Sequence, residues 1–355
     1  MEIRLWRSKV TMRHAIDAAH QRHEHRERLF LEIEAEGVSG FGEVDPQPVA
    51  LNADPGIDEV LDELVGLVIP RLRDMSKHEG ALPSWSRLGR LAGPRRASNP
   101  ALALVEMALL ERELRVAGRT LQDLWPPMVV TPLQVSASLI GDDPWHVSPD
   151  AARVRVKADP RRLDARALER LKSLRVPVLL DLNCSAFDDD EVIELVHRVA
   201  EVTTIAGLEQ PYAPGNVVDH ARLAQRLDVA ISIDEGLRSM TDVRQIVRYG
   251  AAQMICVKPA RVGGLANART IIARAREAGL RPYLGGFFES TYARTVHLAL
   301  ARQGVDEPSD VALVESVEGA DTPEVDLVPG AFGVRPSAQM LERARPVAFF
   351  DGTAI

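Results

Sequence analysis

Five charged residues each end an apolar run in the central part of the chain. They are Lys157, Asp181, Glu209, Asp234 and Lys258, and successive members lie 24 to 28 residues apart. That distance is the length of one strand plus one helix, and in a parallel barrel the carboxyl ends of the strands meet at one mouth. A single Asp in such a position is more often a turn residue or a helix cap. Five charged residues in register instead favour one shared site.

The types of these residues indicate metal-assisted proton transfer. Three carboxylates brought together repel one another, and a hard divalent cation with oxygen ligands, ordinarily Mg²⁺, relieves the repulsion. A substrate carboxylate in the open metal positions would be neutralised, and the same ion would stabilise an enediolate as the α-proton leaves. The two lysines can serve as base and acid if burial and nearby positive charge lower their pKa values. Arg155 and Arg261 lie close enough in the sequence to supply that charge.

Short β-rich runs alternate with helical segments after Pro126-Pro127. The runs are almost continuously apolar, which is typical of strands buried on both faces of a sheet. Eight such units, the eighth being the weakest, predict an α/β fold with a closed parallel (β/α)₈ barrel. The predicted strands are residues 133–139, 152–157, 176–182, 204–209, 229–234, 253–258, 282–286 and 311–314, and the predicted helices are residues 164–174, 190–200, 217–226, 239–249 and 266–278.

The first part of the chain predicts a separate α+β arrangement. Polar and apolar residues alternate over residues 28–44, and Glu36-Gly37 between them predicts an antiparallel hairpin. Residues beyond about 327 leave the rhythm of the barrel and are expected to return to this first domain. A length of 355 residues also favours two unequal domains, because single cores rarely grow that large.

Two helices are predicted within this first domain. Apolar residues recur at helical spacing over residues 54–74, with Asp54 as the N-cap. A second helix is predicted over residues 100–116, with Asn99 as its cap. Residues 76–94 show no clear period and are interpreted as an irregular connection.

Composition excludes several classes of function. The net charge of −8 and the pI near 5.7 argue against nucleic acid as a partner. The two cysteines, Cys184 and Cys256, cannot build a disulfide framework or a cysteine-rich metal site, and we interpret them as small buried residues. The sequence begins without a signal-peptide hydrophobic region, and no stretch reaches the roughly 18 apolar residues of a membrane span. We therefore expect a cytoplasmic protein that does not enter a membrane.

The motifs at the strand ends, taken in order, resemble the enolase superfamily. The similarity is to its muconate-lactonizing subgroup, and within that to the branch of o-succinylbenzoate synthases and N-succinylamino acid racemases. No single motif is specific, whereas their order and spacing over residues 28–292 are. The motifs are Gly40-Phe-Gly-Glu43, Val105-Glu-Met-Ala-Leu109, Arg155-Val-Lys157, Asp181-Leu-Asn183, Glu209-Gln-Pro211, Asp234-Glu235, Lys258-Pro-Ala-Arg261-Val-Gly-Gly264 and Gly285-Gly-Phe-Phe-Glu-Ser290.

The resemblance implies an enolase-like, modified TIM barrel with an α+β capping domain. The implied division is residues 1–127 for the cap, residues 128–326 for the barrel, and residues 327–355 for a segment that returns to the cap. It further implies Mg²⁺ as the cofactor, with Mn²⁺ as the alternative, a small-molecule carboxylate as the substrate, and a homo-oligomeric assembly.

The resemblance also implies a role for individual residues. The implied metal ligands are Asp181, Glu209 and Asp234, and Lys157 and Lys258 stand on opposite faces of the substrate. The implied orienting or tuning residues are Arg155, Asn183, Glu235 and Arg261. The implied substrate contacts are Ser138, Gly286, Phe287 and Glu289.

Two motifs depart from the family pattern. The usual Lys-x-Lys reads Arg155-Val-Lys157, which keeps the charge at the first position but removes an exchangeable proton. General-base chemistry at Lys157 survives that change. The usual Gly-Gly-Met-Leu-Glu reads Gly285-Gly-Phe-Phe-Glu289, which indicates a narrower or more aromatic pocket. The identity of the substrate is therefore the least constrained inference.

The cap of such enzymes closes over the barrel mouth and reads the distal part of the substrate. Here residues 14–25 and 45–52 are expected to do so. His20, His23 and His25 could suggest a transition-metal site, but no carboxylate or cysteine pattern completes a ligand set. We interpret them as part of a mobile polar loop that carries specificity.

Several functions remain open from the sequence. The leading hypotheses are an o-succinylbenzoate-synthase-like dehydratase and an N-succinyl or N-acylamino acid racemase, and the alternatives are a dipeptide epimerase and a muconate-type cycloisomerase. A ligand-binding barrel without catalysis is disfavoured, because it needs no acid/base pair. A phosphate-handling barrel predicts a Gly-rich loop late in the barrel. Phe287-Phe288-Glu289 after Gly285-Gly286 is a poor cradle for an anion.

Overall fold

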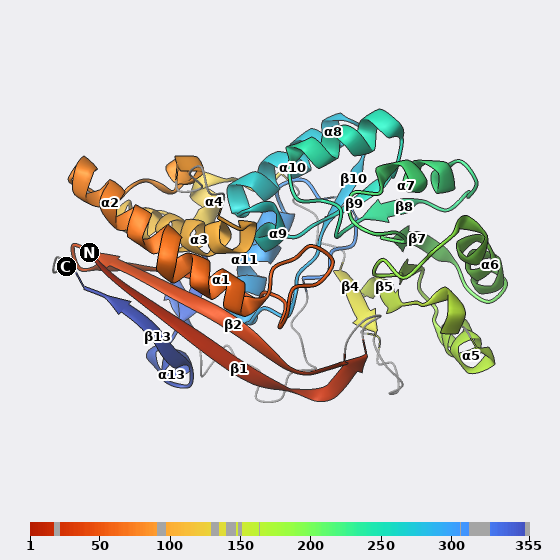
Figure 1. Cartoon of the computed structure of the whole chain (residues 1–355), viewed down its shortest axis with the longest axis horizontal. Helices are drawn as coiled ribbons and strands as arrows, with labels where there is room; N and C mark the ends of the chain where they lie inside the picture. Colours follow the sequence, from red (N-terminus) through yellow and green to blue (C-terminus); the bar gives the residue numbers. More distant parts are fainter. Residues whose placement is uncertain are drawn as a thin grey trace.

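Most of the described strands belong to two β-sheets (Figure 1). The structure is a computed structural model and describes residues 1–17, 22–90, 97–128, 135–139, 147, 151–162, 164–305, 307–311 and 327–351. A four-stranded sheet has the strand order β13-β1-β2-β3, and a seven-stranded sheet has the order β10-β9-β8-β7-β6-β5-β4. We refer to the first sheet with its helices as the cap and to the second as the barrel.

The cap sheet is antiparallel throughout. Its β2–β3 turn places Glu36 at φ 56° and Gly37 at φ 74°, the left-handed pair that a two-residue hairpin turn requires. The predicted hairpin is therefore confirmed. The fourth strand comes from the far end of the sequence and pairs with β1. The strands are β1 (Glu2–Asp17), β2 (Arg22–Ala35), β3 (Val38–Val44) and β13 (Arg345–Phe350).

The cap helices cover one face of this sheet (Figure 1). Helix α3 lies so close to β3 that a Cβ on Gly40 would sit 2.1 Å from the Ala108 carbonyl oxygen. A glycine is therefore required there. The elements are α1 (Ile57–Glu63), a π-helical turn (Leu64–Val68), α2 (Ile69–Glu79), a 3₁₀ turn (Trp85–Arg90), α3 (Asn99–Val116) and α4 (Leu121–Leu124).

Both predicted helix caps in this domain are wrong. Helix α1 is capped at Gly56, whose N–H donates to the Glu59 carboxylate at 3.0 Å, and Asp54 instead forms ion pairs with arginines of the barrel. Helix α3 is capped at Ser98. The Asn99 side chain donates to two barrel carbonyls instead. In both cases the polar side chain forms long-range contacts with the barrel instead of capping the helix next to it.

The barrel strands are parallel, and each pairs with the strands next to it in sequence. The seven described strands confirm a TIM-barrel-like, enolase-type arrangement. Most of the predicted eighth strand, residues 312–314, lies outside the described residues, but the Asp310 N–H donates to the Leu284 carbonyl beside β10 at 2.8 Å. The strands are β4 (Val135–Leu139), β5 (Ala151–Lys157), β6 (Val178–Asp181), β7 (Ile205–Glu209), β8 (Ile231–Ile233), β9 (Met254–Val257) and β10 (Arg281–Leu284).

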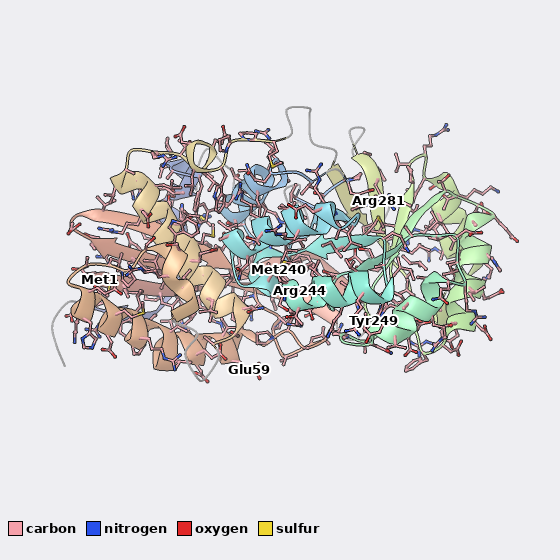
Figure 2. The ribbon with its side chains drawn as sticks, turned by 90° about the horizontal axis from the view of Figure 1, so that it is seen from above. Met1, Glu59, Met240, Arg244, Tyr249 and Arg281 are labelled. Atoms are coloured by element: carbon pink, nitrogen blue, oxygen red, sulfur yellow. The ribbon has the colours of Figure 1, made fainter. Side chains whose placement is uncertain are left out.

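Helices follow the barrel strands and cover their outer side (Figure 1). In the view from above, Met1 and Glu59 lie in the cap half, and α8, with Met240 and Tyr249, lies outside the strands (Figure 2). The helices are a 3₁₀ turn (Pro160–Arg162), α5 (Ala165–Ser173), α6 (Asp189–Ala200), α7 (Val217–Ala224), α8 (Met240–Tyr249), α9 (Pro259–Val262), α10 (Leu265–Glu277) and α11 (Thr291–Ala301).

The segment after the barrel packs back toward α11 and the cap. A hairpin of β11 (Leu327–Gly330) and β12 (Gly333–Pro336) precedes α13 (Ala338–Glu342). Inside this hairpin, the Ala331 carbonyl accepts a hydrogen bond from Leu121 of the cap at 3.0 Å. Among the helices that the structure describes, none combines the length and apolar character needed to cross a bilayer.

Candidate active site

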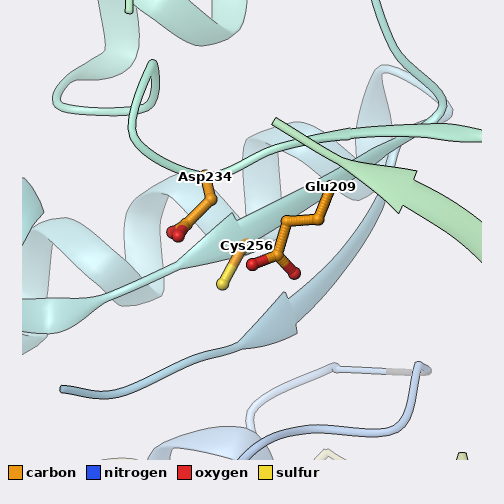
Figure 3. A group of neighbouring side chains, drawn as sticks. All are labelled: Glu209, Asp234 and Cys256. Atoms are coloured by element: carbon orange, nitrogen blue, oxygen red, sulfur yellow. The ribbon is translucent and has the colours of Figure 1, made fainter. Parts of the chain in front are cut away.

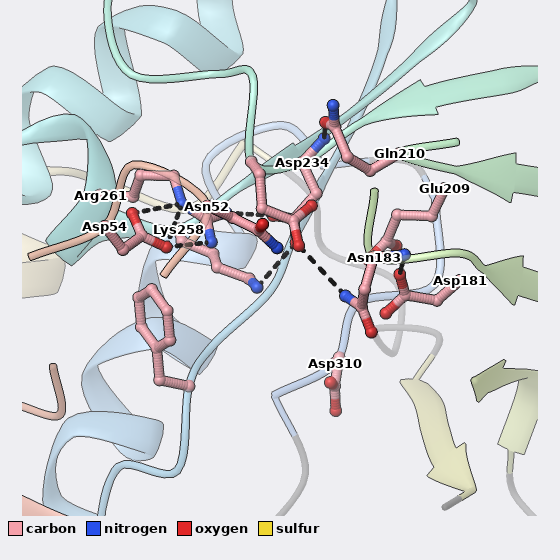
Figure 4. Close-up of polar contacts among 12 residues, drawn as sticks. Asn52, Asp54, Asp181, Asn183, Glu209, Gln210, Asp234, Lys258, Arg261 and Asp310 are labelled. Atoms are coloured by element: carbon pink, nitrogen blue, oxygen red, sulfur yellow. Dashed lines mark hydrogen bonds and ion pairs between the residues drawn. The ribbon is translucent and has the colours of Figure 1, made fainter. Parts of the chain in front are cut away.

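The predicted chemical residues lie together at the carboxyl ends of the barrel strands (Figure 4). Lys157 of β5 is in register with Asp181 of β6, and Asp181 is in register with Glu209 of β7. Asp234 follows β8, and Lys258 follows β9. Three of the five are the last residue of a strand and two follow a strand directly, so the backbone positions of all five are set by one sheet.

Three buried carboxylates form the centre of this site. Asp181, Glu209 and Asp234 are each at most 1% exposed. A buried charge is stable only when it is paired. Arg155 supplies one partner, since its Nη1 lies 3.0 Å from Glu209 Oε1 and 3.9 Å from Asp181 Oδ2. One guanidinium therefore brings two of the carboxylates together.

The two lysines pair with the outer two carboxylates. Lys157 Nζ lies 2.8 Å from Asp181 Oδ2, and Lys258 Nζ lies 2.9 Å from Asp234 Oδ2. Because β6, β7 and β8 separate β5 from β9 in the sheet, the two amines flank the carboxylate cluster from opposite sides.

The electrostatics of the three carboxylates differ. Burial and then the Asp181 charge raise the pKa of Glu209 to about 7. Burial also opposes ionisation of Asp181, but the Lys157 and Arg155 charges outweigh it and lower the pKa. The pKa of Asp234 is lowered below its usual range, since Arg261 and Lys258 overcome the effect of burial. The central carboxylate is thus the one most in need of further positive charge.

The pKa of Lys258 does not follow the expectation from the sequence. Burial has the largest single effect and lowers it, but the Asp234 carboxylate and smaller contributions together outweigh burial, and the pKa of Lys258 is raised above its usual value. Its ammonium also lies 4.9 Å from the centre of the Phe287 ring, a cation–π contact. The Asp234 carboxylate therefore favours the ammonium form of Lys258.

The donor set fits a hard divalent cation. Ligand atoms of Glu209, Asp234 and Cys256 lie within 4.8 Å of one another (Figure 3). Burial, with the Asp234 charge, raises the pKa of the Cys256 thiol well above its usual value, so the sulfur stays protonated. Oxygen atoms are what Mg²⁺ prefers, and Asp181 of the neighbouring strand supplies a third carboxylate. Asp181, Glu209 and Asp234 are the residues that would hold such an ion.

Asn183 and Glu235 lie against these groups. Asn183 has φ 43°, which turns its amide N–H onto Asp181 Oδ1 at 3.0 Å. Its side-chain oxygen accepts a hydrogen bond from Lys157, and its Nδ2 donates to Glu235 Oε1 at 3.1 Å. Asn183 therefore links Lys157, Asp181 and Glu235 in one chain of hydrogen bonds.

Two further buried residues were missed by the sequence analysis. Gln210 Oε1 accepts hydrogen bonds from the N–H groups of Asp234 at 2.9 Å and Gly236 at 3.0 Å, which fixes the turn after β8. Tyr283 of β10 donates its hydroxyl proton to Glu209 Oε2, and Ser232 lies 2.8 Å from the same hydroxyl. Gln210 belongs to a motif quoted for the resemblance. Nothing local marks Tyr283.

The loop after β10 supplies one residue to the site and buries the others. A Cβ on Gly285 would lie 3.0 Å from Lys258 Cε, so this glycine gives the lysine room. Phe287 faces the lysine. Gly286 and Glu289 are buried, and Glu289 Oε1 accepts from the Phe287 N–H at 2.9 Å, so Glu289 shapes the loop. For Ser138 the structure gives the backbone alone, in register with Arg155.

The histidine-rich stretch of the cap is only partly described. His14 lies in β1 and His23 in β2, His25 is exposed, and His20 lies outside the described residues. The predicted loop is therefore wrong for His23 and His25, which pair with Ile16 and Thr11 of β1, because the two strands continue further than the polar composition indicated.

Comparisons with known proteins agree with this geometry. A family model described as enolase C-terminal domain-like matches residues 146–334. An o-succinylbenzoate synthase of Bacillus subtilis is 28% identical over 295 residues, which cover 78% of this chain and 75% of the relative. An N-succinylamino acid racemase of Thermus thermophilus is 26% identical over 297 residues, which cover 80% of this chain and 78% of the relative.

Solved structures give the same fold. A member of the enolase superfamily from Listeria innocua superposes with a TM-score of 0.80 at 20% identity, covering 98% of this chain and 97% of that one. The family model spans more than half of the chain, and the site it positions lies at the barrel strand ends. The protein therefore belongs to the enolase superfamily, an enzyme superfamily that includes o-succinylbenzoate synthases and N-succinylamino acid racemases.

Proposed function

We propose that this protein is a divalent-metal-dependent enzyme that removes the proton α to a substrate carboxylate. Asp181, Glu209 and Asp234 are the metal ligands, and Lys157 and Lys258 exchange protons with the substrate. When bound, the cation, Mg²⁺ or Mn²⁺, would neutralise the substrate carboxylate and stabilise the negative charge that develops as the proton leaves.

The observation that carries this proposal is the order of charges across the sheet. An amine, three carboxylates and a second amine follow one another along β5, β6, β7, β8 and β9. A substrate carboxylate held at the carboxylate cluster would present its α-carbon between the two amines. A protein that only binds a ligand has no use for an acid and a base so placed.

The two lysines have distinct parts in each candidate reaction. In a dehydration, Lys157 takes the α-proton and passes a proton to the β-hydroxyl, which leaves as water, while Lys258 stays a cation that stabilises the negative charge of the intermediate. In a racemisation, each lysine takes the proton from one enantiomer and the other returns it on the opposite face. Asn183 orients the Lys157 amine through its side-chain oxygen.

For the substrate we propose an acid that carries a succinyl group. The similar proteins named above are an o-succinylbenzoate synthase and an N-succinylamino acid racemase. Both names describe succinyl-bearing carboxylates. A dipeptide epimerase or a muconate-type cycloisomerase would use the same site and differ in what the cap contacts, and solved structures of both kinds share the fold.

We further propose that the chain divides into a cap of residues 1–127, a barrel of residues 128–326 and a returning segment of residues 327–355, supported by the pairing of β13 with β1. We propose a homo-oligomer from the family resemblance. Static light scattering that finds a stable monomer at micromolar concentration would contradict the latter.

Proton exchange in D₂O tests the proposed chemistry directly. The protein is incubated with N-succinylamino acids and Mg²⁺, and the α-proton signal is followed by NMR. In a separate reaction, it is incubated with the hydrated precursor of o-succinylbenzoate, and dehydration is followed by ultraviolet absorption. We expect exchange or dehydration with at least one substrate, complete loss on chelation, and loss in Asp234→Asn. Activity that persists after exhaustive chelation would rule out the metal-dependent mechanism.

A further inference from the structure

A tight turn of the cap meets the active site on the side of Lys258. The backbones of Leu51 and Asp54 are hydrogen bonded in both directions, at 2.9 and 2.8 Å. The two residues between them, Asn52 and Ala53, have φ values of 49° and 65°. The left-handed region is unfavourable for a residue with a Cβ such as Ala53, so contacts outside the turn must hold it in place.

Two arginines of the barrel supply those contacts. Arg261 donates to Asp54 from Nε, at 3.1 Å to Oδ1, and from Nη2, at 2.7 Å to Oδ2. Arg238 Nη2 donates to Asp54 Oδ1 at 2.8 Å and to the Asn52 carbonyl at 3.0 Å. The Asp54 side chain is 5% exposed and that of Arg261 is 1% exposed. The pair is therefore desolvated, where charge–charge interactions are strong.

The other edge of Arg261 reaches the proposed metal site (Figure 4). Its Nη1 donates to Asp234 Oδ1, while Lys258 Nζ lies 2.9 Å from Asp234 Oδ2. A guanidinium is a rigid planar fork, so fixing one edge fixes the direction of the other. The backbone of Arg261 is held as well, since Asn99 of the cap donates to its carbonyl at 2.6 Å.

We propose that Asp54 is a positioning residue that acts through Arg261 on Asp234, and that it thereby couples the seating of the cap to metal binding. The inference rests on the proposed function, in which Asp234 is a metal ligand. With a dication in place, Arg261 would be a buried cation beside it, and Asp54 supplies the compensating negative charge. Without Asp54, the whole charge of Arg261 would fall on Asp234 and oppose the metal.

Metal affinity measured by isothermal titration calorimetry tests this coupling without any need for a substrate. The full-length protein is titrated with Mg²⁺ and with Mn²⁺. We expect Asp54→Asn to weaken binding by about tenfold, the size found for groups that orient metal ligands. Asp54→Glu, which keeps the charge, should recover much of that loss. Asp58→Asn is the matched control, because Asp58 forms an exposed pair with Arg7 at 2.6 Å, outside the site. Its affinity should equal that of the wild type.

A double-mutant cycle separates action through Arg261 from a general loosening of the turn. If Asp54 acts through Arg261, Asp54→Asn should change the affinity by less than about twofold in an Arg261→Gln background. Arg238→Gln releases the turn without touching Asp234 and should change the affinity little. Should Asp54→Asn fail to fold, Arg261→Lys gives the same test, because an ammonium cannot span both carboxylates and affinity should fall.

Two results would overturn the inference while leaving the proposed function intact. One is wild-type metal affinity in folded Asp54→Asn and in Arg261→Lys. The other is an undiminished effect of Asp54→Asn when Arg261 has already been replaced. Absence of divalent-ion binding in the wild-type protein would instead overturn the proposed function, and this inference with it.

Discussion

The two lysines of the site have very different surroundings. The Lys157 side chain is 25% exposed and contacts Asp181 and Asn183, which both belong to the barrel. The Lys258 side chain is 8% exposed and lies between Asp234 and the ring of Phe287. The Lys157 amine is therefore partly exposed and hydrogen bonded to two polar groups, and the Lys258 amine is enclosed.

Among the residues that the structure describes, the cap contacts this site on the Lys258 side. Among the described residues, Asp54 and Asn99 of the cap contact Arg261, which shares Asp234 with Lys258. The described side-chain partners of Lys157 are barrel residues. If the lysines act on opposite faces of the substrate, as proposed, the two faces are controlled by different domains. We expect substitutions in the cap to alter chemistry at Lys258 before they alter chemistry at Lys157.

The largest expected effect comes from removing each lysine. If the protein is a racemase, Lys157→Ala should abolish exchange from one enantiomer of an N-succinylamino acid, and Lys258→Ala should abolish exchange from the other, each by roughly 10²-fold or more. NMR in D₂O with separated enantiomers measures this. In a dedicated synthase, Lys258→Arg should retain some dehydration, because it keeps the charge. Equal loss for both enantiomers in both variants would remove the assignment of one lysine to each face.

The free energy of unfolding is expected to depend on pH because of a buried histidine on the Lys258 side of the site. Burial lowers the pKa of His297 to about 4, and this side chain packs with Glu289 under the loop that carries Phe287. Because the folded value lies below that of the unfolded chain, stability is complete above about pH 6.5 and is lost as the pH falls toward 4. The free energy of unfolding should fall by about 2 kcal/mol between pH 7 and pH 5.

Urea unfolding at the two pH values measures that loss. His297→Gln should flatten the dependence between pH 7 and pH 5. His78→Gln, which changes an exposed histidine of α2, is the matched control and should leave the dependence as it is. A slope that is the same in all three proteins would show that His297 does not cause it.

A substitution at the centre of the site should affect the reactions at both lysines equally. Tyr283 donates a hydrogen bond to Glu209, which lies between the two lysine faces. Tyr283→Phe should weaken metal binding by about tenfold, because the carboxylate loses the group that orients it. Tyr249→Phe, at an exposed tyrosine of α8, is the control. Exchange from both enantiomers should fall equally, and a fall confined to one would place Tyr283 on that face.

The smallest effect concerns the ring beside Lys258. Phe287→Leu removes a cation–π contact and should slow the Lys258-dependent direction by about two- to fivefold, which corresponds to roughly 0.5–1 kcal/mol. The Lys157-dependent direction should be unchanged. Phe288→Leu is the neighbouring control, since Phe288 lies 4.5 Å from the guanidinium of Arg26 instead. An equal change in both directions would mean that Phe287 shapes the pocket as a whole.

The ends of the barrel strands could be predicted from the sequence, because each apolar run stops at a charged residue. An apolar run that ends in a charged residue marks both a buried strand and its open end, so residues 204–209 were predicted for the strand observed at Ile205–Glu209. The register of Lys157, Asp181 and Glu209 follows, since neighbouring parallel strands end at one edge. The structure brings these residues together, and their chemical roles stay predictions.

Partners distant in sequence were not predictable from local patterns. Asp54 before Pro55 has the local signature of a helix cap, yet its carboxylate binds Arg261, 207 residues away. Tyr283 lies in an ordinary strand, and its partner Glu209 is 74 residues distant. Glu289 was assigned to the substrate from its motif; in the structure it is buried and accepts a hydrogen bond from its own loop, and its contact with substrate stays a prediction. The local sequence suggests one partner for a polar side chain, whereas the tertiary fold determines which partner it contacts.

The pairing of β1 with β13 has a consequence for synthesis of the chain. The pairs join residues 3–7 to residues 345–350, so the ribosome makes the whole barrel before β1 obtains its outer neighbour. At 5–20 residues per second this leaves an unpaired strand edge for roughly 20–70 s. Exposed edges invite pairing with other chains, so β1 is open to pairing with another chain until β13 has been made.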